Sequence, residues 1–134
     1  MESVSPFFEF LAIILLAFVI ARYLFGRGVD GVSYPDAVKI LQDEDSALLL
    51  DVRTKKEFET GHPTGAVNIP LQELKNRLES LMPHKNKTVV VICASGMRSR
   101  MALRLLKKAG FPNVKNFQGG LSSWKGSVER PMAK

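Results

Sequence analysis

The feature that most constrains the fold is a buried strand that leads into a helix through a very short loop. Residues 88–93 are mostly β-branched, and a segment with helical periodicity begins at Arg98. The small residues of the loop 94–97 separate the two. Such a unit is typical of a parallel sheet covered by helices, because parallel strands need crossover connections. It also places Cys93, the only cysteine, at the carboxyl end of a buried strand.

The same alternation of strands and helices extends over residues 32–134. Predicted strands cover residues 47–52, 66–69, 88–93 and 114–117, and predicted helices cover residues 34–42, 55–59, 72–81 and 98–109. The first of these helices is expected to begin with a capping box of Ser33 and Asp36. The order predicts the α/β class, with a parallel sheet flanked by helices on both faces. Ligand sites in such sheets lie beyond the carboxyl ends of the strands, where Asp51 and Cys93 are placed.

An apolar stretch, residues 7–25, precedes this domain. As a helix it would rise about 28 Å, close to the thickness of a bilayer core. Glu9 lies near one end, and Arg22, Tyr23 and Arg27 lie at the other. The chain has no basic start and no clear cleavage site, which argues against a signal peptide, and the stretch has no polar face, which argues against a core helix. These features favour a transmembrane helix.

The sequence therefore predicts four parts: a short extracytoplasmic N-terminus at 1–6, a transmembrane helix at 7–25, a linker at 26–31 and a domain at 32–134. Basic residues are absent before the span and frequent after it, so the positive-inside rule predicts a single-pass protein of the inner membrane with a cytoplasmic domain. The cytoplasm keeps a free thiol reduced. The short linker would hold the domain near the bilayer, which makes membrane lipid an expected partner.

Charge and cysteine content exclude several classes of site. The net charge is +6, and all of the excess lies on residues 28–134. Long Lys/Arg tracts are absent and aromatic residues are few, so nucleic acid is not an expected partner. A single cysteine excludes an internal disulfide, a Cys-x-x-Cys pair and a cysteine-rich zinc site, and no metal or cofactor is expected. The charge fits an anionic substrate or an anionic lipid surface.

The loop after the central strand predicts a catalytic thiolate. Its amide hydrogens and the start of the following helix form an anion-binding cradle, which lowers the pKa of a cysteine. Cys93 is the candidate nucleophile, and the candidate substrate-binding residues are Ala94, Ser95, Gly96, Met97, Arg98 and Ser99. The forked donors of Arg98 are expected to orient an anionic substrate. The alternative is a buried cysteine that only packs, as is common in β-branched strands, but the Cys-x4-Arg-Ser pattern favours chemistry.

Three further residues are candidates for a supporting role. Asp51 is expected to cap loop amides at the end of its strand, although it can also tune the site electrostatically. Arg53 is expected either to help bind an anion or, by preference, to pair with Glu57. His62 lies in a Gly-His turn, where a hydrogen bond to the backbone is favoured over general-base catalysis, because a thiolate needs no base.

Four ordered motifs resemble those of the rhodanese homology family over residues 30–130. They are Asp51-Val52-Arg53 with Glu57-Phe58, the segment Gly61–Pro70, the loop Cys93–Ser99, and the set Asn116, Gly119, Gly120 and Trp124. The second motif departs from the pattern, since Pro63-Thr64 stands where the family has Ile-Pro. We expect this shift to change the packing of that turn rather than the chemistry of Cys93.

The resemblance implies a rhodanese-like fold and sulfur transfer through a persulfide on Cys93. The donor would be thiosulfate or a persulfide, and the acceptor a thiol or cyanide. Six residues from Cys93 to Arg98 resemble the loop of the sulfurtransferases, whereas related phosphatases and arsenate reductases carry seven, so these two activities are less expected. The other alternative is a non-catalytic rhodanese-like binding module at the membrane, but such modules often lack the cysteine.

Overall fold

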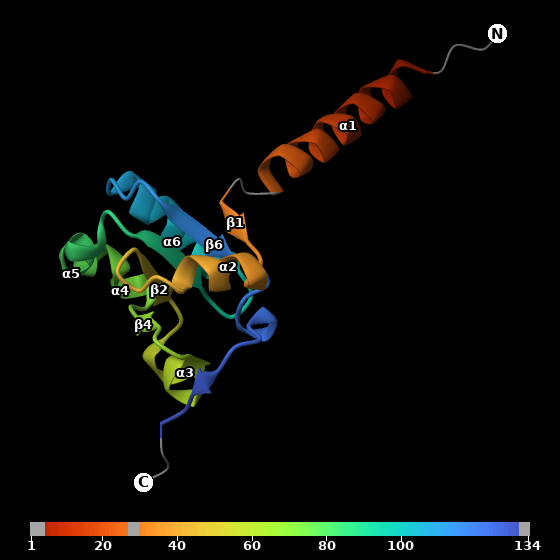
Figure 1. Ribbon diagram of the computed structural model, residues 1–134. Coiled ribbons are helices and arrows are strands. Elements are labelled where there is room, and N and C mark those ends of the chain that lie inside the picture. The colour runs from red at the N-terminus through yellow and green to blue at the C-terminus, as the bar shows by residue number, and fades with distance from the viewer. Residues whose placement is uncertain (1–4, 27–29, 132–134) are drawn as a thin grey trace.

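A five-stranded parallel sheet forms the centre of the domain, in the order β1-β6-β5-β2-β4 (Figure 1). The computed structural model describes residues 5–26 and 30–131. The strands are β1 (Gly31–Val32), β2 (Ala47–Asp51), β4 (Val67–Asn68), β5 (Thr88–Ile92) and β6 (Val114–Phe117). The predicted α/β class and parallel sheet are therefore confirmed.

The two central strands pair along their whole length, from Ala47 opposite Thr88 to Asp51 opposite Ile92. Four of the five residues of β5 and all of β2 are buried, which explains why both read as continuous apolar runs in the sequence. This register brings the carboxyl ends of β2 and β5 together. Cys93, the residue after β5, therefore lies beside the residues that follow Asp51.

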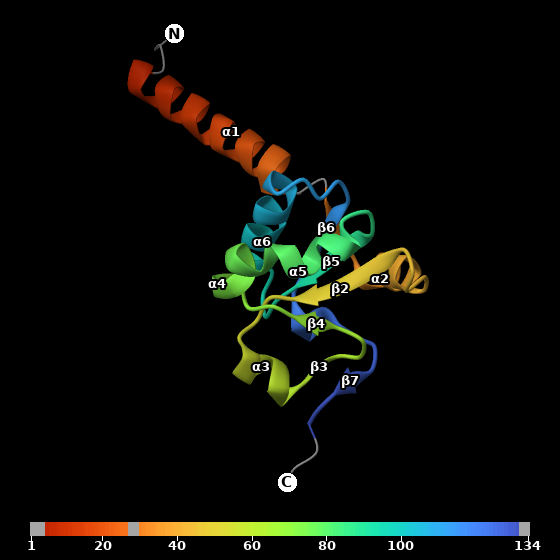
Figure 2. The same cartoon turned by 90° about the vertical axis from the view of Figure 1, so that its left-hand side faces the viewer.

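Helices cover both faces of the sheet (Figure 2). One face packs against α6 (Met97–Lys108) and against a segment made of α4 (Leu71–Leu74), the 3₁₀ turn η1 (Lys75–Arg77), α5 (Leu78–Leu81) and the 3₁₀ turn η2 (Met82–His84). The other face packs against α2 (Tyr34–Leu41). There, Trp124 makes edge contacts with Phe117 and Tyr34 at centroid distances of 5.6 and 5.2 Å. Alternate side chains of β2 and β5 thus enter two separate cores.

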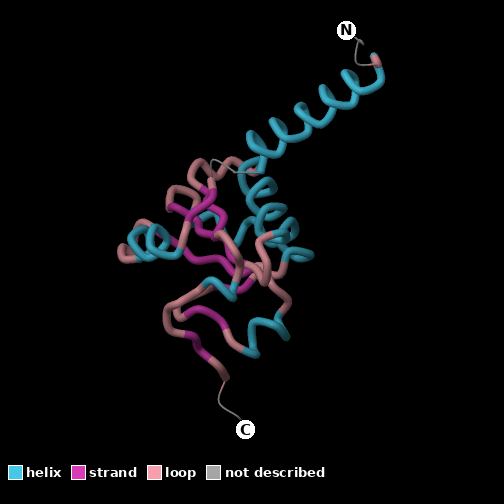
Figure 3. Tube along the Cα trace, turned by 90° about the vertical axis from the view of Figure 1, so that its right-hand side faces the viewer, coloured by secondary structure: helices cyan, strands magenta, loops and turns pink. Residues whose placement is uncertain are grey.

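A second sheet, which has two antiparallel strands, was not predicted. Figure 2 labels these strands below β4, and Figure 3 shows strands in magenta near the C-terminus. In this sheet β3 (His62–Pro63) pairs with β7 (Val128–Glu129). The strand β3 comes directly after the short helix α3 (Lys55–Thr60). The 3₁₀ turn η3 (Leu121–Ser123) comes between β6 and β7. This small sheet ties the C-terminal part of the domain to the turn that contains His62.

Two local predictions are wrong. The capping box predicted at Ser33 does not form, because the Ser33 hydroxyl donates to the Asp36 carboxylate at 3.1 Å instead of accepting an amide. A capping box forms at Thr54 and Glu57 instead. The single helix predicted over 72–81 is divided by the tighter turn η1, although Leu74 and Leu81 still reach the core.

The N-terminal apolar stretch is helical, as α1 (Pro6–Gly26). Its large apolar side chains are exposed, with 68% of Phe7 and 62% of Phe18 accessible. Glu9 lies in its first turn, and Arg22 lies within its bounds. Among residues 5–26 and 30–131, no helix combines the length and apolarity that crossing a membrane needs, so the transmembrane prediction for 7–25 is not supported. Residues 1–4 of the predicted N-terminus and 27–29 of the predicted linker lie outside the described residues, as does the Tyr23 side chain. At the two ends of the predicted linker, Gly26 is the last residue of α1 and Gly31 is the first residue of β1.

Candidate active site

Cys93 is completely buried at the carboxyl end of β5. The amide of Val52 donates to the carbonyl of Ile92 at 3.0 Å, and the amide of Leu121 donates to the carbonyl of Cys93 at 2.8 Å. These bonds fix the backbone on both sides of the cysteine. They leave the side chain facing the loop 94–96, of which Ala94 and Ser95 are exposed and Gly96 is buried.

The sulfur of Cys93 lies among hydrogen-bond donors. The amide of Gly96 donates to Sγ at 2.9 Å, and Ser99 Oγ lies 3.4 Å from Sγ. Gly96 has φ +95° at the N-cap of α6, a conformation that suits glycine and turns its amide toward the sulfur. Burial raises the pKa of the Cys93 thiol. Hydrogen bonds from the Ser99 hydroxyl and the loop amides outweigh burial, so the pKa lies below its ordinary value.

Ser99 connects the sulfur to the sheet. Its Oγ lies 3.0 Å from the carbonyl oxygen of Gly96 and 2.5 Å from Oδ1 of Asn116, and both serine and asparagine are buried. While Cys93 is protonated, its S–H donates to Ser99. Loss of that proton lets the Ser99 hydroxyl turn toward the thiolate, which it then stabilises. Asn116 belonged to the fourth sequence motif, but its contact with Ser99 was not predicted.

Replacing Ser99 with alanine tests this hydrogen bond. We expect Ser99→Ala to raise the pKa of Cys93, because the thiolate loses its side-chain donor. At neutral pH the rate of reaction at sulfur should fall on the order of tenfold, the effect of losing one hydrogen bond to a charged group. The ultraviolet absorbance of the thiolate, followed against pH and corrected with Cys93→Ser, measures the pKa. An unchanged pKa would contradict this role.

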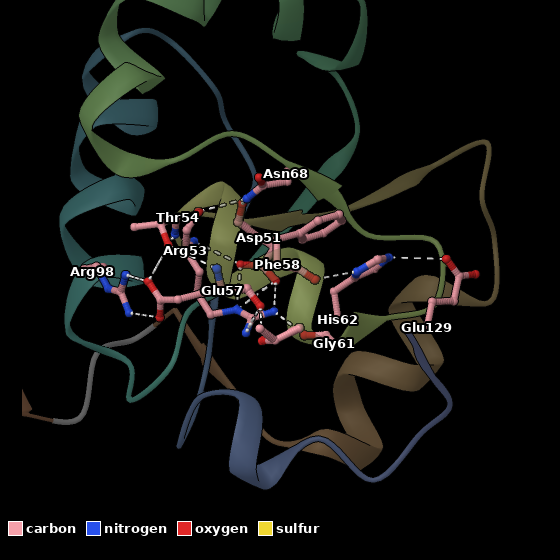
Figure 4. Close-up of polar contacts among 11 residues, drawn as sticks. Asp51, Arg53, Thr54, Glu57, Phe58, Gly61, His62, Asn68, Arg98 and Glu129 are labelled. Atoms are coloured by element: carbon pink, nitrogen blue, oxygen red, sulfur yellow. Dashed lines mark hydrogen bonds and ion pairs between the residues drawn. The ribbon is translucent and has the colours of Figure 1, made fainter. Parts of the chain in front are cut away.

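Asp51 and Arg53 form a buried ion pair next to the site (Figure 4). Arg53 Nη2 lies 2.8 Å from Oδ2 of Asp51, and the amide of Arg53 donates to Oδ1 at 2.9 Å. Asp51 therefore caps a loop amide, as predicted. The predicted side-chain pair of Arg53 with Glu57 is wrong: the guanidinium turns to the buried carboxylate and donates to the backbone oxygens of Gly61 and Glu57 at 2.7 and 3.3 Å.

Arg98 projects from the first turn of α6 and is engaged by Glu57. Its Nη1 and Nη2 donate to the two carboxylate oxygens at 2.6 and 2.9 Å (Figure 4). The hydrogen bonds from Arg98 lower the pKa of Glu57 to about 2, against the effect of burial. The guanidinium that was expected to orient an anionic substrate thus already has a carboxylate partner, which lies 41 positions away in the sequence.

His62 lies in the small sheet, in β3 opposite Glu129 of β7. Its ring stacks on Phe58 with centroids 3.6 Å apart, and Nδ1 lies 2.9 Å from the Phe58 carbonyl oxygen, the backbone bond that the turn predicts. Nε2 lies 3.3 Å from the Glu129 carboxylate.

The departure from the family pattern at Pro63-Thr64 adds a hydrogen bond to this region. Thr64 stands where the family has proline, and threonine has the backbone amide that proline lacks. That amide donates to the carbonyl of Ser127 at 3.1 Å.

Gly120 packs against the loop that follows Cys93, a contact that the sequence did not reveal. A Cβ atom at this position would lie 2.1 Å from the carbonyl oxygen of Ala94 and 2.6 Å from the amide nitrogen of Ser95. The turn after β6 is therefore packed directly against the loop that carries Cys93.

Among residues 5–26 and 30–131, no group of three or more His, Cys, Asp or Glu residues is arranged to hold a metal.

The chain is similar in sequence and in structure to known proteins. A family model described as a rhodanese-like domain matches residues 34–127. The putative sulfur carrier protein YrkF of Bacillus subtilis is 42% identical over 95 residues, which cover 70% of this chain and 50% of YrkF, so the chain spans about half of that relative. The thiosulfate sulfurtransferase PspE of Escherichia coli is 42% identical over 72 residues, covering 54% of this chain and 68% of PspE. A solved structure described as a rhodanese with anions from E. coli has a TM-score of 0.57 and 34% identity, covering 63% of this chain and 98% of that one.

Proposed function

The chain belongs to the rhodanese-like domain family, and from this we propose that it is a sulfurtransferase that carries sulfur as a persulfide on Cys93. The observation that carries the proposal is the buried sulfur of Cys93, which accepts a hydrogen bond from the Gly96 amide and lies beside the Ser99 hydroxyl. These donors favour the thiolate, which is the nucleophilic form of cysteine. They are equally suited to the negative charge of a persulfide.

The proposed reaction has two steps. The Cys93 thiolate attacks the outer sulfur of thiosulfate, the sulfur–sulfur bond of the donor breaks, and sulfite leaves with the electron pair. Cys93 then carries a persulfide anion. A thiol or cyanide attacks its terminal sulfur, which restores the thiolate and releases the product. The chain itself contributes the nucleophile and the amides that hold the charge, and no proton acceptor is needed.

The loop geometry favours this reaction over the two alternatives. The six-residue span from Cys93 to Arg98 leaves a narrow cradle in which the Gly96 amide donates to the sulfur itself. That arrangement suits a single sulfur atom better than a tetrahedral oxyanion. A non-catalytic binding module would have no use for a cysteine whose pKa is lowered by a hydroxyl and by backbone amides.

The proposed activity is tested with purified protein, thiosulfate and cyanide. We expect thiocyanate to form in multiple turnovers, at a rate that depends on both substrates. A phosphate ester and arsenate, offered separately, should not be turned over. Turnover of either compound without thiocyanate formation would overturn the proposal.

We further propose that the protein works attached to a membrane, with the domain on the cytoplasmic side of the inner membrane. The support is the exposed apolar surface of α1 and the excess positive charge of residues 28–134. Full-length protein is expected in the membrane fraction, and carbonate extraction distinguishes a superficial from an inserted helix. Recovery of the full-length protein only in the soluble fraction would contradict attachment.

A further inference from the structure

Glu57 occupies both forked donors of Arg98. The two short bonds are bidentate, at 2.6 and 2.9 Å, between side chains that are 32% and 36% exposed. Glu57 is itself fixed, because the amide and the hydroxyl of Thr54 donate to its Oε1 at 3.2 and 3.0 Å. The carboxylate is thus held in place at the start of α3, and the guanidinium of α6 is drawn to it (Figure 4).

Protonation does not open this ion pair near neutral pH. Hydrogen bonding from Arg98 lowers the pKa of Glu57 to about 2, so the carboxylate stays charged. The hydrogen bonds that Arg98 donates to Glu57 raise the pKa of Arg98, and the charges of Cys93 and Asp51 raise it further. The guanidinium therefore lies within electrostatic reach of the reactive sulfur, although its donors point to Glu57. An anionic ligand can compete with Glu57 for these donors, because both side chains are partly exposed.

We propose that Glu57 selects the sulfur donor: by engaging Arg98, it makes the site accept persulfides of low charge in preference to thiosulfate. This inference rests on the proposed sulfurtransferase function. Thiosulfate carries two negative charges and must either displace Glu57 from Arg98 or bind close to an uncompensated carboxylate. A neutral persulfide needs neither, because the amide of Gly96 and the hydroxyl of Ser99 already face the sulfur.

The two sulfur donors differ in the charge of the group that leaves when sulfur is transferred. With thiosulfate, the thiolate forms a bond to the outer sulfur and a sulfite dianion departs. With a neutral persulfide R–S–SH, the thiolate forms a bond to the terminal sulfur, the S–S bond of the donor breaks, and a thiolate RS⁻ departs while the proton stays on the new persulfide. Neither step changes the total number of electrons or needs an oxidant. Only the first step releases a dianion, which a guanidinium freed from Glu57 would stabilise.

The decisive variant is Glu57→Gln. Glutamine also serves at the third position of a capping box, so α3 keeps its N-terminal hydrogen bonds while the negative charge is removed. We expect the concentration of thiosulfate that half-saturates persulfide formation on Cys93 to fall about tenfold, because Arg98 loses its charged, bidentate partner and can bind the dianion instead. The half-saturating concentration of the persulfide of N-acetylcysteine methyl ester, which has a neutral body, should change less than twofold. Both values come from single-turnover loading followed by intact mass.

Two control variants separate donor selection from a structural role. Thr54→Ala removes the hydroxyl that donates to the Glu57 carboxylate and accepts from the Glu57 amide, but it keeps the negative charge of Glu57 beside Arg98. The ratio of the two half-saturating concentrations should therefore stay within twofold of the wild type. In Glu57→Gln with Arg98→Met, the gain for thiosulfate should disappear, because the released guanidinium is absent.

The outcomes distinguish this inference from the function on which it rests. If wild-type protein forms the persulfide but Glu57→Gln leaves the donor ratio unchanged, the pair is only structural and the inference fails while the function stands. A gain for thiosulfate that persists without Arg98 would also overturn it, since simple charge removal would then be the cause. If neither donor adds sulfur to wild-type Cys93, the proposed function fails as well.

Discussion

Cys93→Ser is expected to leave no measurable sulfur transfer. A serine hydroxyl is not ionised near neutral pH and cannot hold a persulfide, so both steps of the reaction are lost. The fold should survive, because the smaller oxygen can still accept from the amide of Gly96 and bond to Ser99. We expect the free energy of unfolding to change by about 1 kcal/mol or less. Thiocyanate formation measures the first effect, and thermal unfolding measures the second. Retained turnover in a correctly folded Cys93→Ser protein would contradict the persulfide mechanism.

Gly120→Ala is expected to cause the second largest loss, although Gly120 carries no chemistry. The added Cβ would meet the carbonyl oxygen of Ala94 at 2.1 Å, a distance that forces the backbone of the loop to move. A displacement of about 1 Å at a reacting group can lower the rate roughly a hundredfold. We therefore expect kcat/KM to fall by about that factor, in addition to a loss of stability from the positive φ of +69°.

Gly65→Ala provides a matched control for this substitution. Gly65 also has a positive φ, +82°, but nothing lies within 4 Å of the Cβ position. Alanine there should lower stability by roughly 1–2 kcal/mol through backbone strain alone and leave sulfur transfer unchanged. Steady-state rates and thermal melts of the two variants compare them directly. Equal activity of both variants would show that contact between Gly120 and the loop does not position Cys93.

The sheet and the position of the cysteine could be predicted because both depend on local patterns. The strands at 47–51 and 88–92 are buried on both faces, and such strands appear as unbroken apolar runs. The helix after the loop shows a clear period and ends in basic residues before Gly110. The small sheet of β3 and β7 was missed because strands of two residues have no period to detect.

The partners of the charged residues could not be predicted, because spacing alone does not select them. Arg53 and Glu57 are four positions apart, but Arg53 precedes the first helical residue, Lys55, so helical spacing does not apply to the pair. The aspartate of Ser33-x-x-Asp36 is shorter than the glutamate that a capping box uses, whereas Thr54-x-x-Glu57 meets the requirement. The pairing of Glu57 with Arg98 depends on how α3 and α6 are placed by the sheet, which is a property of the fold.

The most direct test of the central claim is the intact mass of the protein after incubation with each sulfur donor in turn. We predict a gain of one sulfur atom that cyanide removes and that Cys93→Ser does not show. If neither thiosulfate nor the neutral persulfide adds sulfur while Cys93 still reacts with an alkylating reagent, the chain is not a sulfurtransferase of this kind, and a binding role for the domain would replace it.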